Sequence, residues 1–131
     1  MFLTDKNIIL LSEVDSTNNY AKQLVAEKAH SGTVVLAQYQ KNGRGQVGNF
    51  WESEAGKNLL FSLILYPAFL DAGKQFYISK VVSLALVEVL NECIIDVKIK
   101  WPNDIYVGDK KIAGILIENT MKGNKLESSV I

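Results

Sequence analysis

Short apolar runs separated by polar breaks dominate the amino-terminal half of the chain. Residues 7–14 and 33–38 are rich in β-branched side chains, which is typical of strands. Residues 58–66 form a third run of this kind, and Pro67 closes it. Because residues 33–38 do not alternate with polar positions, we expect both faces of that strand to be buried.

Two segments show helical periodicity instead. The polar residues 15–18 can accept hydrogen bonds from the free amides of a first helical turn, and apolar positions then recur at helical spacing to about His30. Residues 75–92 carry a wide apolar stripe, which predicts the main core helix. Cys93 follows this stripe and is expected to be a buried structural thiol.

The carboxyl-terminal part has the pattern of hairpins. Short strand-like runs occupy residues 97–101, 105–107, 111–118 and 126–131. Pro102 interrupts the first run, and the pairs Gly108-Asp109 and Gly123-Asn124 are typical of hairpin turns. Two helices among many strands predict an α+β fold with a mixed, mostly antiparallel sheet.

Length and charge narrow the class of protein. The chain has 131 residues, 48% of them hydrophobic, which fits a single domain with a core of its own. Lysine plus arginine number 14, as do aspartate plus glutamate, so no net field favours nucleic acid or an anionic membrane. The apolar run at residues 8–11 is too short for a signal peptide or a membrane span, and a cytoplasmic location is expected. The last strand stops in mid-pattern, so we expect a piece of a longer domain.

The first candidate site is a glycine-rich loop at residues 40–57. A structureless loop longer than about 12–15 residues is usually functional or disordered. Residues 43–48 (Gly-Arg-Gly-Gln-Val-Gly) combine a backbone that can approach a ligand closely with one fork-shaped cation, Arg44. The loop lacks the Gly-Lys-Ser/Thr ending of a P-loop, and no dinucleotide fingerprint opens a helix.

A second cluster lies at residues 100–104 (Lys-Trp-Pro-Asn-Asp). Lys100 suits phosphate oxygens, and Asp104 can hold a hard cation such as Mg²⁺. A plain turn that caps a hairpin explains the same residues. Further on, either Lys110 or its neighbour Lys111 must point inward from a strand, where it needs an anionic partner. A ligand carboxylate, a phosphate, Glu118 or another protein acid would serve.

Nucleophilic and zinc chemistry find no support in the sequence. His30 is the one histidine and Cys93 the one cysteine, so no Ser-His-Asp set, Cys-His set or zinc cluster can be assembled. His30 fits a helix end better than a catalytic role.

In their order along the chain, these motifs resemble the catalytic domain of biotin protein ligases. The resemblance rests on residues 16–18, 40–46, 51, 100–104 and 111–116. It implies a fold like that of class II aminoacyl-tRNA synthetases, in which residues 1–131 form the amino-terminal portion of the domain, without its final strands and its carboxyl-terminal β-barrel. No helix-turn-helix domain precedes the motifs, so DNA binding is not expected.

The resemblance also implies a reaction. With ATP and Mg²⁺, biotin becomes biotinyl-5′-AMP, and biotin then passes to a lysine of a biotin carboxyl carrier protein such as that of acetyl-CoA carboxylase. Relatives of this kind are often homodimers. Two alternatives stay open, namely a lipoate or octanoate ligase or transferase of the same fold and an inactive biotin-binding fragment.

Residue roles follow from the resemblance by position. It assigns catalysis to Lys111 and Arg44. Biotin contacts fall on Ser16, Thr17, Asn18, Gln40, Gly43, Arg44, Gly45, Gln46, Lys111, Gly114 and Leu116. ATP contacts fall on Arg44, Trp51, Lys100, Asn103 and Asp104, with Asp104 also as the Mg²⁺ ligand. Gln46 stands where many relatives have arginine, so Arg44 is the single cation of residues 43–48.

Overall fold

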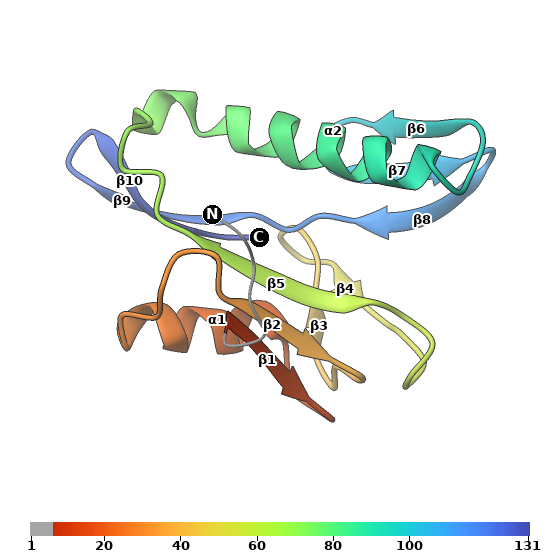
Figure 1. The fold of residues 1–131 in the computed structure, drawn as a ribbon, viewed down its shortest axis with the longest axis horizontal. Helices are drawn as coiled ribbons and strands as arrows, with labels where there is room; N and C mark the ends of the chain where they lie inside the picture. The colour runs from red at the N-terminus through yellow and green to blue at the C-terminus, as the bar shows by residue number, and fades with distance from the viewer. Residues whose placement is uncertain (1–6) are drawn as a thin grey trace.

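A computed structural model describes residues 7–131 and arranges them in three sheets with two α-helices (Figure 1). The amino-terminal half contains β1 (Ile8–Leu11), α1 (Thr17–Ala26), β2 (Val34–Ala37), β3 (Gly43–Arg44), β4 (Phe50–Trp51) and β5 (Leu60–Leu65). A 3₁₀ turn, η2 (Ala72–Lys74), then leads into α2 (Phe76–Asn91). The remaining strands are β6 (Val97–Lys100), β7 (Asp104–Val107), β8 (Lys110–Gly114), β9 (Glu118–Lys122) and β10 (Lys125–Val130).

The largest sheet has five strands in the order β1-β2-β5-β10-β9. β1 pairs with β2 in parallel, and the other neighbours are antiparallel. A three-stranded antiparallel sheet holds β6, β7 and β8, and β3 pairs with β4 alone. The predicted α+β class with a mostly antiparallel sheet is confirmed.

The apolar core lies between α1 and the five-stranded sheet. Ala21 of α1 packs with Val35 of β2, Ile64 of β5 and Val130 of β10, all of which are almost fully buried. Leu24 and Val25 extend the helix face over this cluster. Burial of these side chains fixes the start of α1 against the centre of the sheet.

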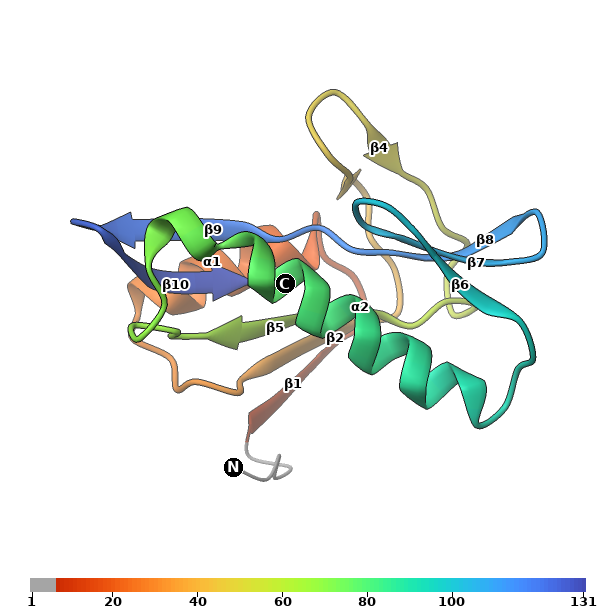
Figure 2. The same cartoon turned by 90° about the horizontal axis from the view of Figure 1, so that it is seen from above.

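The prediction that residues 75–92 form the main core helix is wrong. α2 forms there, but Ile78 and Ser83 are its buried residues, while Val81 and Val89 of the predicted stripe are exposed. α2 runs along the opposite side of the molecule from α1 and packs mainly on β6 and β7 (Figures 1 and 2). The small sheet is too narrow to cover a helix that is apolar on most of its surface.

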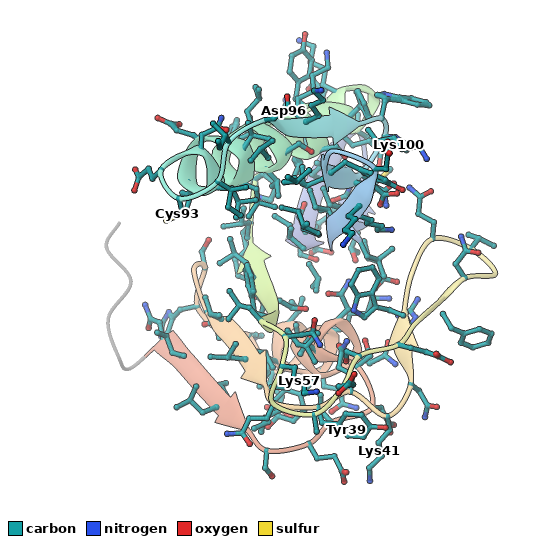
Figure 3. All side chains as sticks on the ribbon, turned by 90° about the vertical axis from the view of Figure 1, so that its right-hand side faces the viewer. Tyr39, Lys41, Lys57, Cys93, Asp96 and Lys100 are labelled. Atoms are coloured by element: carbon teal, nitrogen blue, oxygen red, sulfur yellow. The ribbon has the colours of Figure 1, made fainter. Side chains whose placement is uncertain are left out.

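Two burial predictions are corrected as well. Cys93 is exposed, because it lies past the end of α2 in a turn at the edge of the molecule (Figure 3). In β2, buried Val35 and Ala37 alternate with half-buried Val34 and Leu36, instead of both faces being buried. α1 covers one face of this strand, and α2 lies over the small sheet rather than on the second face.

The predicted first helix ends at Ala26, not near His30. Its carbonyls are satisfied by a Schellman arrangement, in which Lys28 donates to Val25 O and Ala29 donates to Leu24 O. Lys28 adopts the left-handed conformation, with φ of 62°, that this motif usually gives to glycine. Since lysine is an unusual residue there, the sequence carried no stop signal.

The run at residues 111–118 is two strands and not one. β8 ends at Gly114 in the small sheet, and β9 begins at Glu118 in the large sheet. Between them, Ile115 is held by Asn103, whose backbone oxygen accepts from Ile115 N and whose Nδ2 donates to Ile115 O, both at 2.9 Å. This crossing joins the two sheets. The predicted turns at residues 108–109 and 123–124 are confirmed.

Within residues 7–131, neither helix combines the length and the apolar character needed to cross a membrane.

The core predicts a contrast between two isoleucines. Ile64→Ala should lower the free energy of unfolding by about 2–5 kcal/mol, because it leaves a cavity at a fully buried position. Ile95→Ala removes the same atoms from a side chain that is 91% exposed and should change it by less than about 0.5 kcal/mol. Urea unfolding followed by circular dichroism measures both, and equal losses would contradict this location of the core.

Candidate functional site

The glycine-rich loop folds into a short hairpin. Gly43 pairs with Trp51 and Arg44 with Phe50, and Gly45 N donates to Asn49 O across the turn. The tip carries exposed side chains and extends away from the large sheet (Figure 2). The hairpin thus places Arg44 and Trp51 at its base, beside the rest of the molecule.

Gly43 is required by the closeness of the two hairpin strands. A Cβ atom on Gly43 would lie 2.3 Å from the backbone oxygen of Trp51 and 3.2 Å from Gln40 Nε2. The first contact is with backbone, which cannot rotate away. Glycine is therefore the residue that permits this pairing.

Trp51 connects the hairpin with β8. Lys111 Nζ lies 5.1 Å from the centre of the Trp51 ring, a cation–π distance. A Cβ atom on Gly114 would lie 2.9 Å from Trp51 Cζ3, so the ring rests on the bare backbone of Gly114. Two motifs separated by some sixty residues in the chain therefore share one site.

The anionic partner of Lys111 is Asp104. Their Nζ and Oδ1 atoms lie 2.8 Å apart, and both side chains are partly buried. Of the alternatives left open by the sequence, another protein acid is thus the one observed, and Glu118 is not that partner. A ligand carboxylate or phosphate must compete with Asp104 for Lys111.

A network of hydrogen-bonded polar side chains forms the floor of the site. Ser16 caps α1 by accepting from Asn19 N, and Gln40 Oε1 accepts from both the backbone N and the Oγ1 of Thr17. Ser62 Oγ, on β5, donates to Asn18 Oδ1 and lies 2.8 Å from Thr17 Oγ1. Thr17, Asn18 and Ser62 are almost fully buried and bonded to one another, so the floor is a fixed polar network.

Glu118 forms ion pairs with two cations, Arg44 and Lys22, at the edge of this floor. It accepts from both Nη atoms of Arg44, from Lys22 Nζ and from Asn18 Nδ2. Asn19 Oδ1 also accepts from Arg44, at 2.6 Å. Burial alone would raise the pKa of Glu118, but the bonds from Lys22, Arg44 and Asn18 outweigh it and hold the pKa below its ordinary value.

Several predicted site residues have other partners in this structure. Lys100 Nζ lies 5.0 Å from the ring of Tyr106, and Figure 3 places Lys100 far from Tyr39 and Lys41 of the loop side. The Asn103 side chain holds Ile115 O, as described above. Leu116 contributes a backbone oxygen that accepts from Asn18 Nδ2 at 3.3 Å. Gln46 is exposed in the hairpin turn. Their ligand roles stay predictions.

Three polar residues of the site, Asn19, Lys22 and Ser62, were not predicted from the sequence. Glu118 was named only as a possible partner of Lys111, and its pairing with Arg44 was missed. Ser62 had a readable signal, since it is a polar residue inside an otherwise apolar strand. Asn19 is half-buried and Lys22 is exposed on an ordinary helix, and their role follows from how α1 lies beside the start of β9.

Among residues 7–131, no group of three or more His, Cys, Asp or Glu side chains could hold a metal ion. A single carboxylate such as Asp104 is enough for the kind of Mg²⁺ site in which substrate phosphates supply most of the ligands. The site holds three cations, and each is paired with an acid: Arg44 and Lys22 with Glu118, and Lys111 with Asp104. It suits a ligand that carries a polar ring and an anionic group.

Comparison with known proteins gives consistent matches. Residues 10–131 match the model of the biotin/lipoate A/B protein ligase family. The bifunctional ligase/repressor BirA of Salmonella typhimurium is 39% identical over 132 residues, which cover 98% of this chain and 40% of that protein. The chain therefore spans about two fifths of the length of this curated relative.

Solved structures match as well. Biotin protein ligase from Aquifex aeolicus, in complex with biotin and ATP, has a TM-score of 0.73 and 35% identity, over 95% of this chain and 51% of that one. Biotin protein ligase from Leishmania major, in complex with biotinyl-5-AMP, has a TM-score of 0.70 and 29% identity, over 97% and 57% respectively.

Gly43→Ala should separate the two hairpin strands. Because the new Cβ would meet the Trp51 backbone, we expect a loss of about 1–3 kcal/mol in the free energy of unfolding and a changed near-ultraviolet circular dichroism spectrum. Gly73→Ala is the control, since its Cβ would meet nothing within 4 Å. A Gly43 variant that behaves like the Gly73 variant would refute the close pairing.

Glu118 predicts a pH-dependent contribution to stability. Its folded pKa is lowered, so the stabilisation is present above the ordinary glutamate pKa and is lost as the pH falls through the folded value. Glu118→Gln should cost about 1 kcal/mol at pH 7, and the difference from wild type should shrink below about pH 4. Urea unfolding from pH 3 to pH 7 measures it. A difference that stays constant over this range would be inconsistent with a charged Glu118 in the folded state.

Proposed function

Because the chain belongs to the biotin/lipoate A/B protein ligase family, we propose that it forms the biotin-activating site of an ATP-dependent biotin protein ligase. The product would be biotinyl-5′-AMP, and the acceptor a lysine of a biotin carboxyl carrier protein. The relatives and solved structures described above carry names that point the same way.

The observation that carries the proposal is the contact of Trp51 with Lys111 and Gly114. It brings the arginine hairpin and the inward lysine into one site, although the sequence separates them widely. Activation of a carboxylate by ATP must bring two anions together, which requires cations on both. Lys111, beside the Trp51 ring, and Arg44, which pairs with Phe50 in the same hairpin, would supply these two cations.

The residues have separate tasks in the first step. A carboxylate oxygen of biotin attacks the α-phosphorus of ATP, an acyl–phosphate bond forms, and pyrophosphate leaves. Lys111 would neutralise the reacting carboxylate, and Arg44 the α-phosphate. Mg²⁺ would arrive with the phosphates of ATP, and Asp104 is the carboxylate that fits it.

In the second step the amine of the acceptor lysine attacks the acyl carbon, an amide forms and AMP leaves. The mixed anhydride must be kept from water until the acceptor arrives. The hairpin at residues 43–51 is suited to this task, because its exposed tip can close over the ligand while Gly43 holds its base.

Lipoate is the second candidate substrate, and the polar floor favours biotin over it. Thr17, Asn18, Gln40 and Ser62 carry hydroxyl and amide groups that bond to one another in this structure, and the ureido ring of biotin could replace some of these bonds with its own. The dithiolane ring of lipoate has no such hydrogen-bonding groups. Calorimetric titration of the full chain with biotin, lipoate and ATP separates the two, and lipoate binding without biotin binding would exclude the proposal.

Lys111→Ala should abolish adenylate formation and leave the fold intact, because it removes the cation beside the reacting carboxylate. Lys110→Ala is the matched control, since Lys110 is exposed and forms no ion pair within residues 7–131. Biotin-dependent release of pyrophosphate from ATP, measured in the full chain, should fall at least about 100-fold in the first variant. It should stay near wild type in the second. Undiminished release of pyrophosphate by the Lys111 variant would contradict the role assigned to Lys111.

A further inference from the structure

Arg44 is held by a second group of side chains before any ligand arrives. Its Nη2 lies 2.8 Å from Glu118 Oε1 and its Nη1 lies 3.1 Å from Glu118 Oε2, which is a two-pronged ion pair. The Arg44 side chain is 38% exposed and that of Glu118 is 18% exposed. The loop arginine is thus anchored to the start of β9.

The same donors serve a phosphate. A guanidinium binds a carboxylate or a phosphate with two parallel N–H groups, so one fork cannot hold both anions in this way. Glu118 takes one N–H from each Nη atom of Arg44, along the edge that forms the fork, and Asn19 Oδ1 accepts a second N–H from Nη1. A phosphate that is to be gripped by this fork must therefore take the place of Glu118.

Glu118 keeps partners when Arg44 leaves. Lys22 Nζ, on α1, forms an ion pair with Glu118 Oε1, and Asn18 Nδ2 donates to Oε2 at 3.1 Å. A partly buried carboxylate without a cation would be costly, and that cost would oppose the release of Arg44. Lys22 removes this cost, because the Glu118 carboxylate stays paired with a cation.

Asn18 fixes the carboxylate independently of Arg44. Its Oδ1 accepts from Ser62 in β5, and its Nδ2 also donates to Leu116 O. Asn18 is 6% exposed, so its position is set by the sheet and not by the hairpin. Glu118 therefore stays in place whether or not the hairpin moves.

We propose that Glu118 is a positioning residue that holds Arg44 in the ligand-free protein and releases it to the phosphate of the adenylate, while Lys22 keeps Glu118 neutralised. The proposal rests on the proposed function in one respect, which is that Arg44 faces the adenylate phosphate. It predicts that replacing Glu118 strengthens the binding of a phosphate ligand and that replacing Lys22 weakens it.

Trypsin tests the first half without any ligand. In Glu118→Gln, cleavage between Arg44 and Gly45 should rise about fivefold relative to cleavage between Lys57 and Asn58, measured by mass spectrometry on the full chain. Lys22→Gln should leave that ratio at the wild-type value or below, because Glu118 then has Arg44 as its one cation among the contacts described here. A general loss of stability would raise both cleavages together. An unchanged ratio in Glu118→Gln would overturn the proposal.

Calorimetry tests the second half with a stable phosphodiester analogue of biotinyl-5′-AMP and with biotin. Glu118→Gln should bind the analogue about fivefold more tightly and Lys22→Gln about threefold more weakly than wild type. Biotin, which has no phosphate, should bind all three proteins equally. Shifts of the two variants in the same direction, or equal shifts for biotin and the analogue, would refute the exchange.

The two proposals fail in different ways. If wild type binds neither biotin nor the analogue, the proposed function is wrong and the exchange onto an adenylate falls with it. If wild type binds both ligands and the two variants bind the analogue with the affinity of wild type, the proposed function stands and Glu118 has no part in it.

Discussion

Thr17 and Asn18 are polar side chains buried at the start of a helix, and the site is arranged around the hydrogen bonds that they need. A buried amide without partners costs about 1–3 kcal/mol, so its partners are held in place as firmly as it is. Gln40 meets this need from the loop side, Ser62 from β5, and the backbone of Leu116 from the crossing between the two sheets. Three segments distant in sequence thereby converge on one helix end.

Around this centre, opposite charges compensate one another. Lys111 faces Asp104, and Arg44 faces Glu118, so neither cation is left bare in the ligand-free site. An anionic ligand therefore has to displace an acid from its cation. Its net binding free energy is the difference between the new ligand–cation pair and the acid–cation pair that it replaces. This makes binding depend on the acids as much as on the cations.

The sequence was sufficient for some parts of the fold and not for others. The hairpins at residues 108–109 and 123–124 could be predicted because their turn residues act locally. The burial of α2 could not, because a helix that is apolar on most of its surface does not reveal which side will be covered or how much sheet lies beneath it. The end of α1 was missed because Lys28 occupies a position where glycine is the usual signal.

The site divides in a similar way. Arg44, Lys111 and Gly114 stood out through residue type and motif. The structure brings Lys111 and Gly114 against Trp51, while Arg44 lies in the same hairpin as Trp51 and pairs with Glu118. Lys22 carried no local signal, since a lysine on a helix is an ordinary surface residue, and the sequence offered Glu118 only as a partner of Lys111. The pairing of Lys22 with Glu118 depends on how α1 lies against β9, which is a property of the tertiary fold.

A crystal structure of the full chain with the stable adenylate analogue would show whether the phosphate exchanges with Glu118 on Arg44. The exchange predicts the phosphate within hydrogen-bond distance of both Arg44 Nη atoms, with Glu118 left on Lys22 and Asn18. It also predicts Lys111 on the biotin side of that phosphate and away from Asp104. An analogue bound with the Arg44–Glu118 and Lys111–Asp104 pairs intact would contradict it.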